Sequence, residues 1–331
     1  MSALFKASSS AAHPDKKMVV LGMDGGGTKT EVLIADLDGN ILSSFIGGPT
    51  NLAAVPESEA LEHLEEALSA AFKRLRHVTV KHAVVGMAGI DTLSDIARFR
   101  PFADATLESF GIKQYELLND SAVALENGTE AENAIILIAG TGSVCYGRNA
   151  EGKTARAGGM DYLLADEGSG SWIGRKVLRA VVRARDGRGP ETALTPLILK
   201  HFKIKAVSQL KQKVYEPRLS KMSIAELAKV WESALLQADS VALQIQKQIV
   251  DKLSELVQAV AHSLGFEQQS FDLVLAGSIA LLPVVEPQLR VRLKDTYPTI
   301  NIVIPTLTPA HGAITLALKA AANSNRTVKA V

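Results

Sequence analysis

Three consecutive glycines lie between a carboxylate and several donor side chains near the start of this 331-residue chain. Because glycine has no Cβ, the backbone N–H groups of such a turn can approach an anion closely, and hydroxyls and a lysine add further donors. The turn is therefore predicted to grip phosphate groups, with an ordinary tight turn as the alternative for an isolated glycine triplet. Its residues are Asp24, Gly25, Gly26, Gly27, Thr28 and Lys29.

The turn comes close to a P-loop without being one. Gly22 and Gly27 have the P-loop spacing, but Thr28 stands where the lysine is required. A P-loop must also open a helix, whereas residues 31–37 are β-branched and apolar and are followed by a turn and a second apolar run at 41–46. The glycines are therefore predicted to join two strands of a hairpin.

A second glycine-and-hydroxyl turn repeats this plan about a domain's length further on. It follows the apolar run 134–139, precedes the run 144–148, and consists of Gly140, Thr141, Gly142 and Ser143. Two such hairpins suggest an internally duplicated core with a nucleotide between its halves.

Two polar residues stand where ligand-binding residues are often found. Residues 115–122 run from a strand into a helix, which places Asp120 at the carboxyl end of the strand, where ligands gather in open α/β sheets. The alternative is that Asp120 only caps the helix. Asn51 ends the loop-forming cluster 47–51 and is either a ligand or a turn-forming asparagine.

Periodic apolar patterns predict the elements around these turns. Helices are expected at 57–76 and 95–110, throughout 192–264, and from 309 to 322, with strands at 83–89, 271–276 and 301–304. Met222 and Trp231 are expected in the core. The stripe formed by Arg175, Arg179 and Arg183 is expected to be solvated.

Composition restricts the partners and the compartment. With 36 Lys plus Arg against 35 Asp plus Glu, no net charge favours nucleic acid or an anionic membrane, so a small molecule is the expected partner. The single cysteine, Cys145, fits a reducing compartment and is predicted to be a buried small hydrophobe. No apolar run is long enough to span a bilayer, and residues 1–17 are expected to be a disordered leader. The predicted location is cytoplasmic.

Several stretches together resemble one family. The turn at 24–30, the Asn-Asp pair at 119–120, the Gly-Thr-Gly-Ser turn at 140–143 and Asp-Glu-Gly-Ser at 166–169 resemble the BadF/BadG/BcrA/BcrD ATPase family, in the N-acetylglucosamine kinase-like branch of the sugar kinase, Hsp70 and actin superfamily. This resemblance implies an α/β, two-lobed actin-like (ribonuclease H-like) fold with duplicated mixed sheets and a nucleotide cleft between the lobes. The implied lobes are 18–122 plus 305–322, and 123–304, followed by a flexible tail at 323–331.

The resemblance also implies ATP and Mg²⁺ as cofactors and assigns roles to single residues. Asp24 would orient the hydrated Mg²⁺, and Asp120 would take the proton from a sugar hydroxyl. The nucleotide would contact the two glycine turns, including Lys29, together with Gly277 and Gly312. The residues implied for substrate binding are Asn51, Asp120, Gly159, Met160 and Asp166. The implied activity is phosphorylation of the 6-hydroxyl of an amino sugar, N-acetylglucosamine or glucosamine, by a homodimeric kinase.

Three departures from the family pattern leave the sugar open: Met160 replaces a common tryptophan, and Asp161 and Ala165 replace usual glycines. Other functions within reach of the resemblance are an ATPase that activates a CoA-ester dehydratase or reductase, a non-catalytic sugar-sensing regulator, and an actin-like filament protein. The ATPase activator would need cysteines besides Cys145 to bind its cluster. The regulator would need a helix-turn-helix before Val19, or zinc-binding cysteines. The filament protein would need longer insertions. The kinase is therefore preferred.

Overall fold

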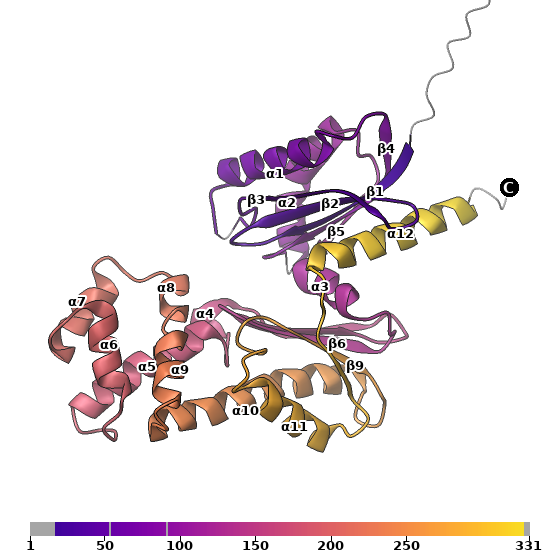
Figure 1. Ribbon diagram of the computed structural model, residues 1–331. Coiled ribbons are helices and arrows are strands. Elements are labelled where there is room, and N and C mark those ends of the chain that lie inside the picture. The colour runs from indigo at the N-terminus through magenta and orange to yellow at the C-terminus, as the bar shows by residue number, and fades with distance from the viewer. Residues whose placement is uncertain (1–16, 53, 91, 328–331) are drawn as a thin grey trace, which may run out of the picture. The chain divides into compact units, whose positions relative to one another are not determined.

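The computed structural model describes residues 17–327 apart from 53 and 91, so nearly all of the predicted leader lies outside the described residues. The chain divides into two compact units (Figure 1). Unit 1 comprises Met1–Val123 and Pro309–Val331, and unit 2 comprises Ala124–Thr308.

Unit 1 contains a mixed five-stranded sheet in the order β3-β2-β1-β4-β5. β1, β2 and β3 form an antiparallel meander, and β1, β4 and β5 run parallel to one another. The predicted first hairpin is confirmed, because Gly25 of β1 pairs with Thr30 of β2. The strands are β1 (Lys17–Gly25), β2 (Thr30–Asp36), β3 (Ile41–Gly47), β4 (Val78–Met87) and β5 (Tyr115–Asn119).

Helices cover both faces of this sheet because its central strands are apolar on both sides. Val19 and Leu21 pack in the cluster under α1 (Glu57–Phe72) and α2 (Leu93–Ser109). Val20 faces the other way, toward α12 (Pro309–Thr327). Because successive side chains of the strand point to opposite faces of the sheet, β1 contributes to two cores. α1 and α12 lie on these opposite faces in Figure 1.

Unit 2 repeats the plan of unit 1. Its sheet has the order β10-β9-β6-β7-β8, with β6, β7 and β8 antiparallel and β6, β9 and β10 parallel. The second hairpin is confirmed by the pairing of Ala139 with Ser143, and the duplicated mixed sheets are confirmed with it. The strands are β6 (Ala134–Ala139), β7 (Ser143–Arg148), β8 (Thr154–Gly158), β9 (Asp272–Ala276) and β10 (Asn301–Val303).

The helices of unit 2 form its larger core against one face of the sheet. α10 (Ser240–Leu264) lays Ile249, Leu253 and Val257 on this core, and Cys145 of β7 is buried there, as predicted. α3 (Asp120–Gly128) contributes Leu125 to the opposite face. The remaining helices are α4 (Asp161–Leu164), α5 (Gly170–Arg185), α6 (Leu194–Phe202), the 3₁₀ helix η1 (Val207–Gln209), α7 (Leu210–Tyr215), α8 (Lys221–Ala225), α9 (Ala228–Leu235) and α11 (Glu286–Thr296).

The prediction of one continuous helical segment from 192 to 264 is wrong. The segment is broken where Lys203 adopts a left-handed conformation after α6, and where Ser220 and Asp239 cap new helices. Trp231 is fully buried as predicted, whereas Met222 is exposed, because α8 is too short to bury more than one face.

Across the described residues, no helix combines the length and the apolar character needed to cross a membrane.

Candidate functional site

The first glycine turn of unit 1 is held from behind by buried side chains. Gly26 N–H donates to the Lys29 carbonyl (2.9 Å), and the hydroxyls of Thr30 and Thr50 lie 2.8 Å apart beneath the turn. A Cβ on Gly25 would lie 2.5 Å from Thr50 Oγ1 and would also collide with the sulfur of Met87. Glycine is therefore required at 25 by close packing. Gly27, Thr28 and Lys29 are exposed, so their polar groups can meet a ligand.

The loop that carries Asn51 is attached to the same turn. The N–H groups of Thr50 and Asn51 both donate to the Gly26 carbonyl, at 3.2 and 3.3 Å. The Asn51 side chain lies against Gly89, where an added Cβ would come within 2.8 Å of Asn51 Oδ1. The predicted phosphate turn and the predicted substrate loop are thus one structural element of unit 1.

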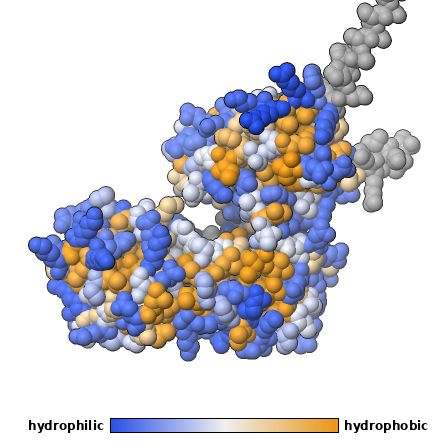
Figure 2. Space-filling view, in the orientation of Figure 1, coloured by the Kyte–Doolittle hydropathy of each residue, from blue (hydrophilic) through white to orange (hydrophobic). Residues whose placement is uncertain are grey.

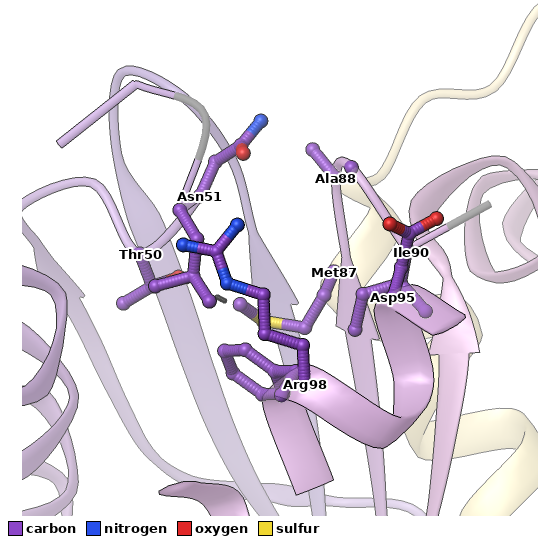
Figure 3. Close-up of a pocket in the computed structure, with 10 residues that line it drawn as sticks. Thr50, Asn51, Met87, Ala88, Ile90, Asp95 and Arg98 are labelled. Carbon is purple, nitrogen blue, oxygen red and sulfur yellow. Dashed lines mark hydrogen bonds between the residues drawn. The ribbon is translucent and has the colours of Figure 1, made fainter. Parts of the chain in front are cut away.

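A cavity of about 120 Å³ opens beside this element. Its lining includes Asn51, Gly89 after β4, and Asp95 and Arg98 of α2. In Figure 3 the Arg98 side chain extends from the helix toward the loop with Thr50 and Asn51. Sequence reasoning missed Arg98, because an exposed arginine on a helix carries no local signal of a site.

Asp120 stands at the position predicted for it, directly after β5 and at the first residue of α3. Asn119 fixes the junction: its Nδ2 donates to the Ile90 carbonyl (3.0 Å), and its Oδ1 accepts the Ser121 N–H (2.9 Å). Asp120 Oδ1 also accepts the Ser121 N–H, at 2.8 Å. Because Asn119 shares the capping of this helix start, the capping role does not depend on Asp120 alone.

Asp24 sits in an acidic environment in unit 1. Burial raises the pKa of Asp24 to about 7, and the charges of Asp120 and Glu31 act in the same direction, against a smaller opposite effect of Lys29. Glu31 pairs with Asp24 across the β1–β2 ladder, and its buried Oε2 has no hydrogen-bond partner among the described residues. This group of carboxylates would be stabilised by a cation.

The raised pKa of Asp24 predicts a pH-dependent stability. Above its ordinary value of 3.8 the unfolded chain releases a proton that the folded chain keeps up to about pH 7, so the Asp24 carboxyl destabilises the fold increasingly as pH rises through that window. Asp24→Asn should therefore stabilise the nucleotide-free protein at pH 8 by about 2–3 kcal/mol more than at pH 4.5. Urea unfolding in EDTA at both pH values measures this difference.

Asp38→Asn, a change of the same kind in the exposed β2–β3 turn, is the control and should show no such pH dependence. An equal response of Asp24→Asn and Asp38→Asn to pH would rule out the raised pKa.

In unit 2 the second turn is closed by contacts with the start of α5. Gly140 N–H donates to the Gly142 carbonyl (2.9 Å), and the N–H groups of Gly170 and Ser171 donate to the carbonyls of Gly140 and Thr141, at 2.7 and 3.1 Å. The Ser143 hydroxyl is used too, since it donates to the Glu167 carbonyl (2.7 Å). The segment 166–171 therefore sets the shape of the turn.

Asp166 is buried against this turn. Its Oδ1 accepts the Ser143 N–H at 3.0 Å, and its Oδ2 lies 2.7 Å from Nζ of Lys221, which also pairs with Asp161. Burial opposes the charge of Lys221, but its hydrogen bonds to Asp161 and Asp166 outweigh that effect and raise the pKa of the ammonium group. Direct contact between Asp166 and a sugar would require this ion pair or its surrounding loop to move aside.

The other predicted residues of unit 2 cluster around the same turn. Gly159 N–H donates to the Ser143 carbonyl (2.9 Å), and Met160 beside it is exposed. Gly277 follows β9 with a φ of +91°, and an added Cβ there would collide with Ala139. Gly312 belongs to unit 1, where it is buried in the first turn of α12.

Lys221 is the residue of this cluster that sequence reasoning missed. It stands 55 positions after Asp166 in a segment predicted to be continuous helix, and no local pattern distinguishes it from a surface lysine. Glu31 was missed for a similar reason, although a carboxylate directly before the continuous apolar run 32–35 was a usable signal.

Known proteins resemble the chain over nearly its whole length. Residues 21–317 match the BadF/BadG/BcrA/BcrD ATPase family. The N-acetylmuramic acid/N-acetylglucosamine kinase of Clostridium acetobutylicum is 32% identical over 302 residues, which cover 90% of this chain and 97% of the relative. The N-acetyl-D-glucosamine kinase of Dictyostelium discoideum is 31% identical over 317 residues, covering 91% and 98%.

Solved structures share the fold at lower sequence identity. A candidate N-acetylglucosamine kinase from Chromobacterium violaceum matches with a TM-score of 0.72 at 23% identity, covering 92% of this chain and 100% of the other. A ROK family glucokinase from Streptomyces griseus, solved with glucose and AMPPNP, matches with a TM-score of 0.56 at 17% identity, covering 90% and 98%. The two five-stranded sheets with their helices are thus an actin-like ATPase fold, and the chain belongs to the BadF/BadG/BcrA/BcrD ATPase family.

Proposed function

We propose that this protein is an ATP-dependent kinase that phosphorylates the 6-hydroxyl of an amino sugar, with N-acetylglucosamine as the preferred substrate. The observation that carries the proposal is that three groups lie together in unit 1. They are the glycine turn after Asp24, the Asn51 loop that is hydrogen-bonded to this turn, and Asp120 at the end of β5, whose charge acts on Asp24. Phosphoryl transfer needs a phosphate clamp, a positioned acceptor and a base beside the attacking hydroxyl. The names of the two relatives above 30% identity support the sugar class.

In this proposal Asp120 accepts the proton of the sugar hydroxyl, and Asn51 with its neighbouring cavity orients the sugar. The turn from Gly25 to Lys29 and the turn from Gly140 to Ser143 supply phosphate donors, and Gly277 lets the backbone approach the nucleotide. In unit 2, Gly159, Met160 and Asp166 are proposed to contact the sugar. We also propose a cytoplasmic homodimer.

The residues around Asp24 fit Mg²⁺. The unpartnered buried Oε2 of Glu31 and the raised pKa of Asp24 mark a place where negative charge is not compensated by protein groups. Asp24, supported by Glu31, would hold the ion, which needs few protein carboxylates when it arrives with nucleotide phosphates. Mg²⁺ would supply neutralisation of the charge on the transferred phosphoryl group.

A coupled ADP-release assay tests the proposal with a panel of N-acetylglucosamine, glucosamine, N-acetylmuramic acid and glucose, each with ATP and Mg²⁺. Stimulation by N-acetylglucosamine above the others is expected. Absence of stimulation by every sugar refutes the kinase assignment, and preference for N-acetylmuramic acid corrects the sugar.

Gly89→Ala should raise the KM for the sugar by about tenfold and leave the KM for ATP nearly unchanged. Gly89 has a φ of +82°, which costs an alanine roughly 1–2 kcal/mol, and the new Cβ would push against Asn51 Oδ1. Steady-state kinetics with each substrate varied in turn measure the split.

The matched control is Gly111→Ala, because Gly111 also has a positive φ, of +74°, but an added Cβ there meets nothing within 4 Å. Equal effects of the two changes on sugar KM would mean that backbone strain alone, and not the Asn51 contact, is responsible.

A further inference from the structure

Unit 2 contains a second, larger cavity that neither glycine turn lines. Its volume is about 830 Å³, and its walls come from α4, α5, η1, α7 and α8 together with the segment that joins α7 to α8. Concave sites of this size are typical of small-molecule binding. Figure 2 shows hydrophilic and hydrophobic residues side by side on the surface over α6 to α8.

One wall of the cavity is strongly cationic. Arg175, Arg179 and Arg183 recur every fourth residue along α5, so the stripe extends over roughly 12 Å of helix. Arg185 of α5 adds to it, Lys211 of α7 and Arg218 of the segment after α7 bring further positive charge from the other side, and none of the described residues that line the cavity is acidic. The stripe was predicted to be solvated, and Arg179 and Arg183 are exposed; η1 and α7 fold beside the stripe, so that it also forms a wall of the cavity.

Several of these cations are not neutralised by the protein. Arg179, Arg185 and Lys211 form no ion pair with any residue that the structure describes, whereas Arg188 at the rim pairs with Asp186 at 2.6 Å. The Nε of Arg175 is buried and has no hydrogen-bond partner in the described part of the chain. A buried donor without an acceptor is unfavourable, so the guanidinium of Arg175 is not fully satisfied by the described part of the protein.

The opposite wall is apolar and aromatic. It includes Val207, Leu210, Val214 and Leu219. Tyr162 of α4 joins the two walls: the Arg175 guanidinium carbon lies 5.9 Å from its ring centroid, and Arg218 donates to its hydroxyl at 3.3 Å. A ligand that fills this cavity must therefore combine anionic groups with an apolar or aromatic body.

We propose that this cavity is a second ligand site, separate from the two phosphate turns, for a small organic polyanion: an aromatic or aliphatic body that carries two or more phosphate, sulfate or carboxylate groups. Guanidinium groups in a row bind such anions through paired N–H donors, and the apolar wall covers the body. The concave shape favours a small molecule over a flat protein partner.

Fluorescence polarisation with 1,3,6,8-pyrenetetrasulfonate, an aromatic tetra-anion, tests the site in the full-length protein. Saturable binding that weakens with added salt is expected. Lys211→Glu should weaken it at least tenfold, and Arg179→Glu by at least as much. Lys247→Glu, the same change at an exposed lysine of α10 in the same unit, should leave binding within twofold of wild type.

Competition experiments test separately whether the ligand needs anionic groups and whether it needs an apolar body. Unlabelled naphthalene-1,5-disulfonate should displace the dye more effectively than tripolyphosphate, which has the charge but no apolar body. Equal displacement by tripolyphosphate overturns the role of the apolar wall. No binding, or equal loss in Lys211→Glu and Lys247→Glu, overturns the site. A dimer in light scattering that dissociates on Arg179→Glu, without dye binding, would mean that a protein covers this surface instead.

Discussion

Asp120→Asn should lower turnover with the amino sugar by roughly 10²-fold to 10⁴-fold, the usual contribution of a positioned general base. Asparagine keeps the size of the side chain but cannot accept the proton of the attacking hydroxyl. The start of α3 should survive, because Asn119 Oδ1 still accepts the Ser121 N–H. ATP affinity should change little, since the proposed phosphate donors lie on the glycine turns and not at Asp120. Single-turnover kinetics and nucleotide titrations measure the two quantities separately.

The matched control is Asp38→Asn, which removes an exposed carboxylate of unit 1 and should retain full turnover. One outcome would contradict the assignment of Asp120 as the base. If Asp120→Asn kept near-normal turnover while the thermal midpoint fell, Asp120 would be a capping residue only, and the base would have to be sought elsewhere.

Lys221→Met should strongly lower the free energy of unfolding. It would leave Asp166, whose side chain is 2% exposed, as a buried carboxylate without its cation. Removing one partner of a buried ion pair costs about 3–5 kcal/mol, and we expect about 3 kcal/mol here because the Lys221 side chain is 33% exposed. Denaturant unfolding measures the loss.

A double variant tests whether the loss of stability comes from the unpaired Asp166 carboxylate. Asp166→Asn combined with Lys221→Met should recover most of the stability, because asparagine tolerates the left-handed backbone at 166, where φ is 64°, and still accepts the Ser143 N–H. Lys252→Met is the control, since it breaks an exposed pair with Glu255 and should cost less than about 1 kcal/mol. Equal losses from Lys221→Met and Lys252→Met would show that solvent already screens the Asp166 pair.

Asp166→Asn alone distinguishes the two roles of this carboxylate. Weaker sugar binding at unchanged stability would favour direct contact with the sugar, whose charge-assisted hydrogen bonds are worth about 1.5–3 kcal/mol each. Altered ATP affinity with unchanged sugar binding would instead favour a role in shaping the Ser143 turn.

Local pattern was enough to predict the parts of the fold that depend on neighbouring residues. Both hairpins follow from apolar runs joined by glycines, and the position of Asp120 follows from an apolar strand that runs into a helix start. Each of these features is decided within about twenty residues, where side-chain period and turn chemistry act together.

Features that depend on distant contacts could not be predicted. The breaks within 192–264 were hidden because apolar spacing continues across them, and left-handed Lys203 is not a glycine. The pairing of Lys221 with Asp166 joins positions that only the folded chain brings together. The cavity beside the arginine stripe of α5 could not be predicted, because the helices that complete its lining lie more than twenty residues away in sequence.

The position of α12 has a consequence for synthesis of the protein. Gly22 of β1 lies so close to this helix that an added Cβ would come within 2.6 Å of the Ile314 backbone nitrogen. During translation, β1 to β5 leave the ribosome first, but the sheet face that carries Val20 and Val84 has only Val123 of α3 as early cover and lacks α12 until that helix emerges. Unit 2, which is continuous in sequence, can complete its core before that moment. The nascent chain must therefore carry a largely uncovered apolar sheet face while some 185 residues of unit 2 are made, and any premature stop before α12 would release a chain without this cover.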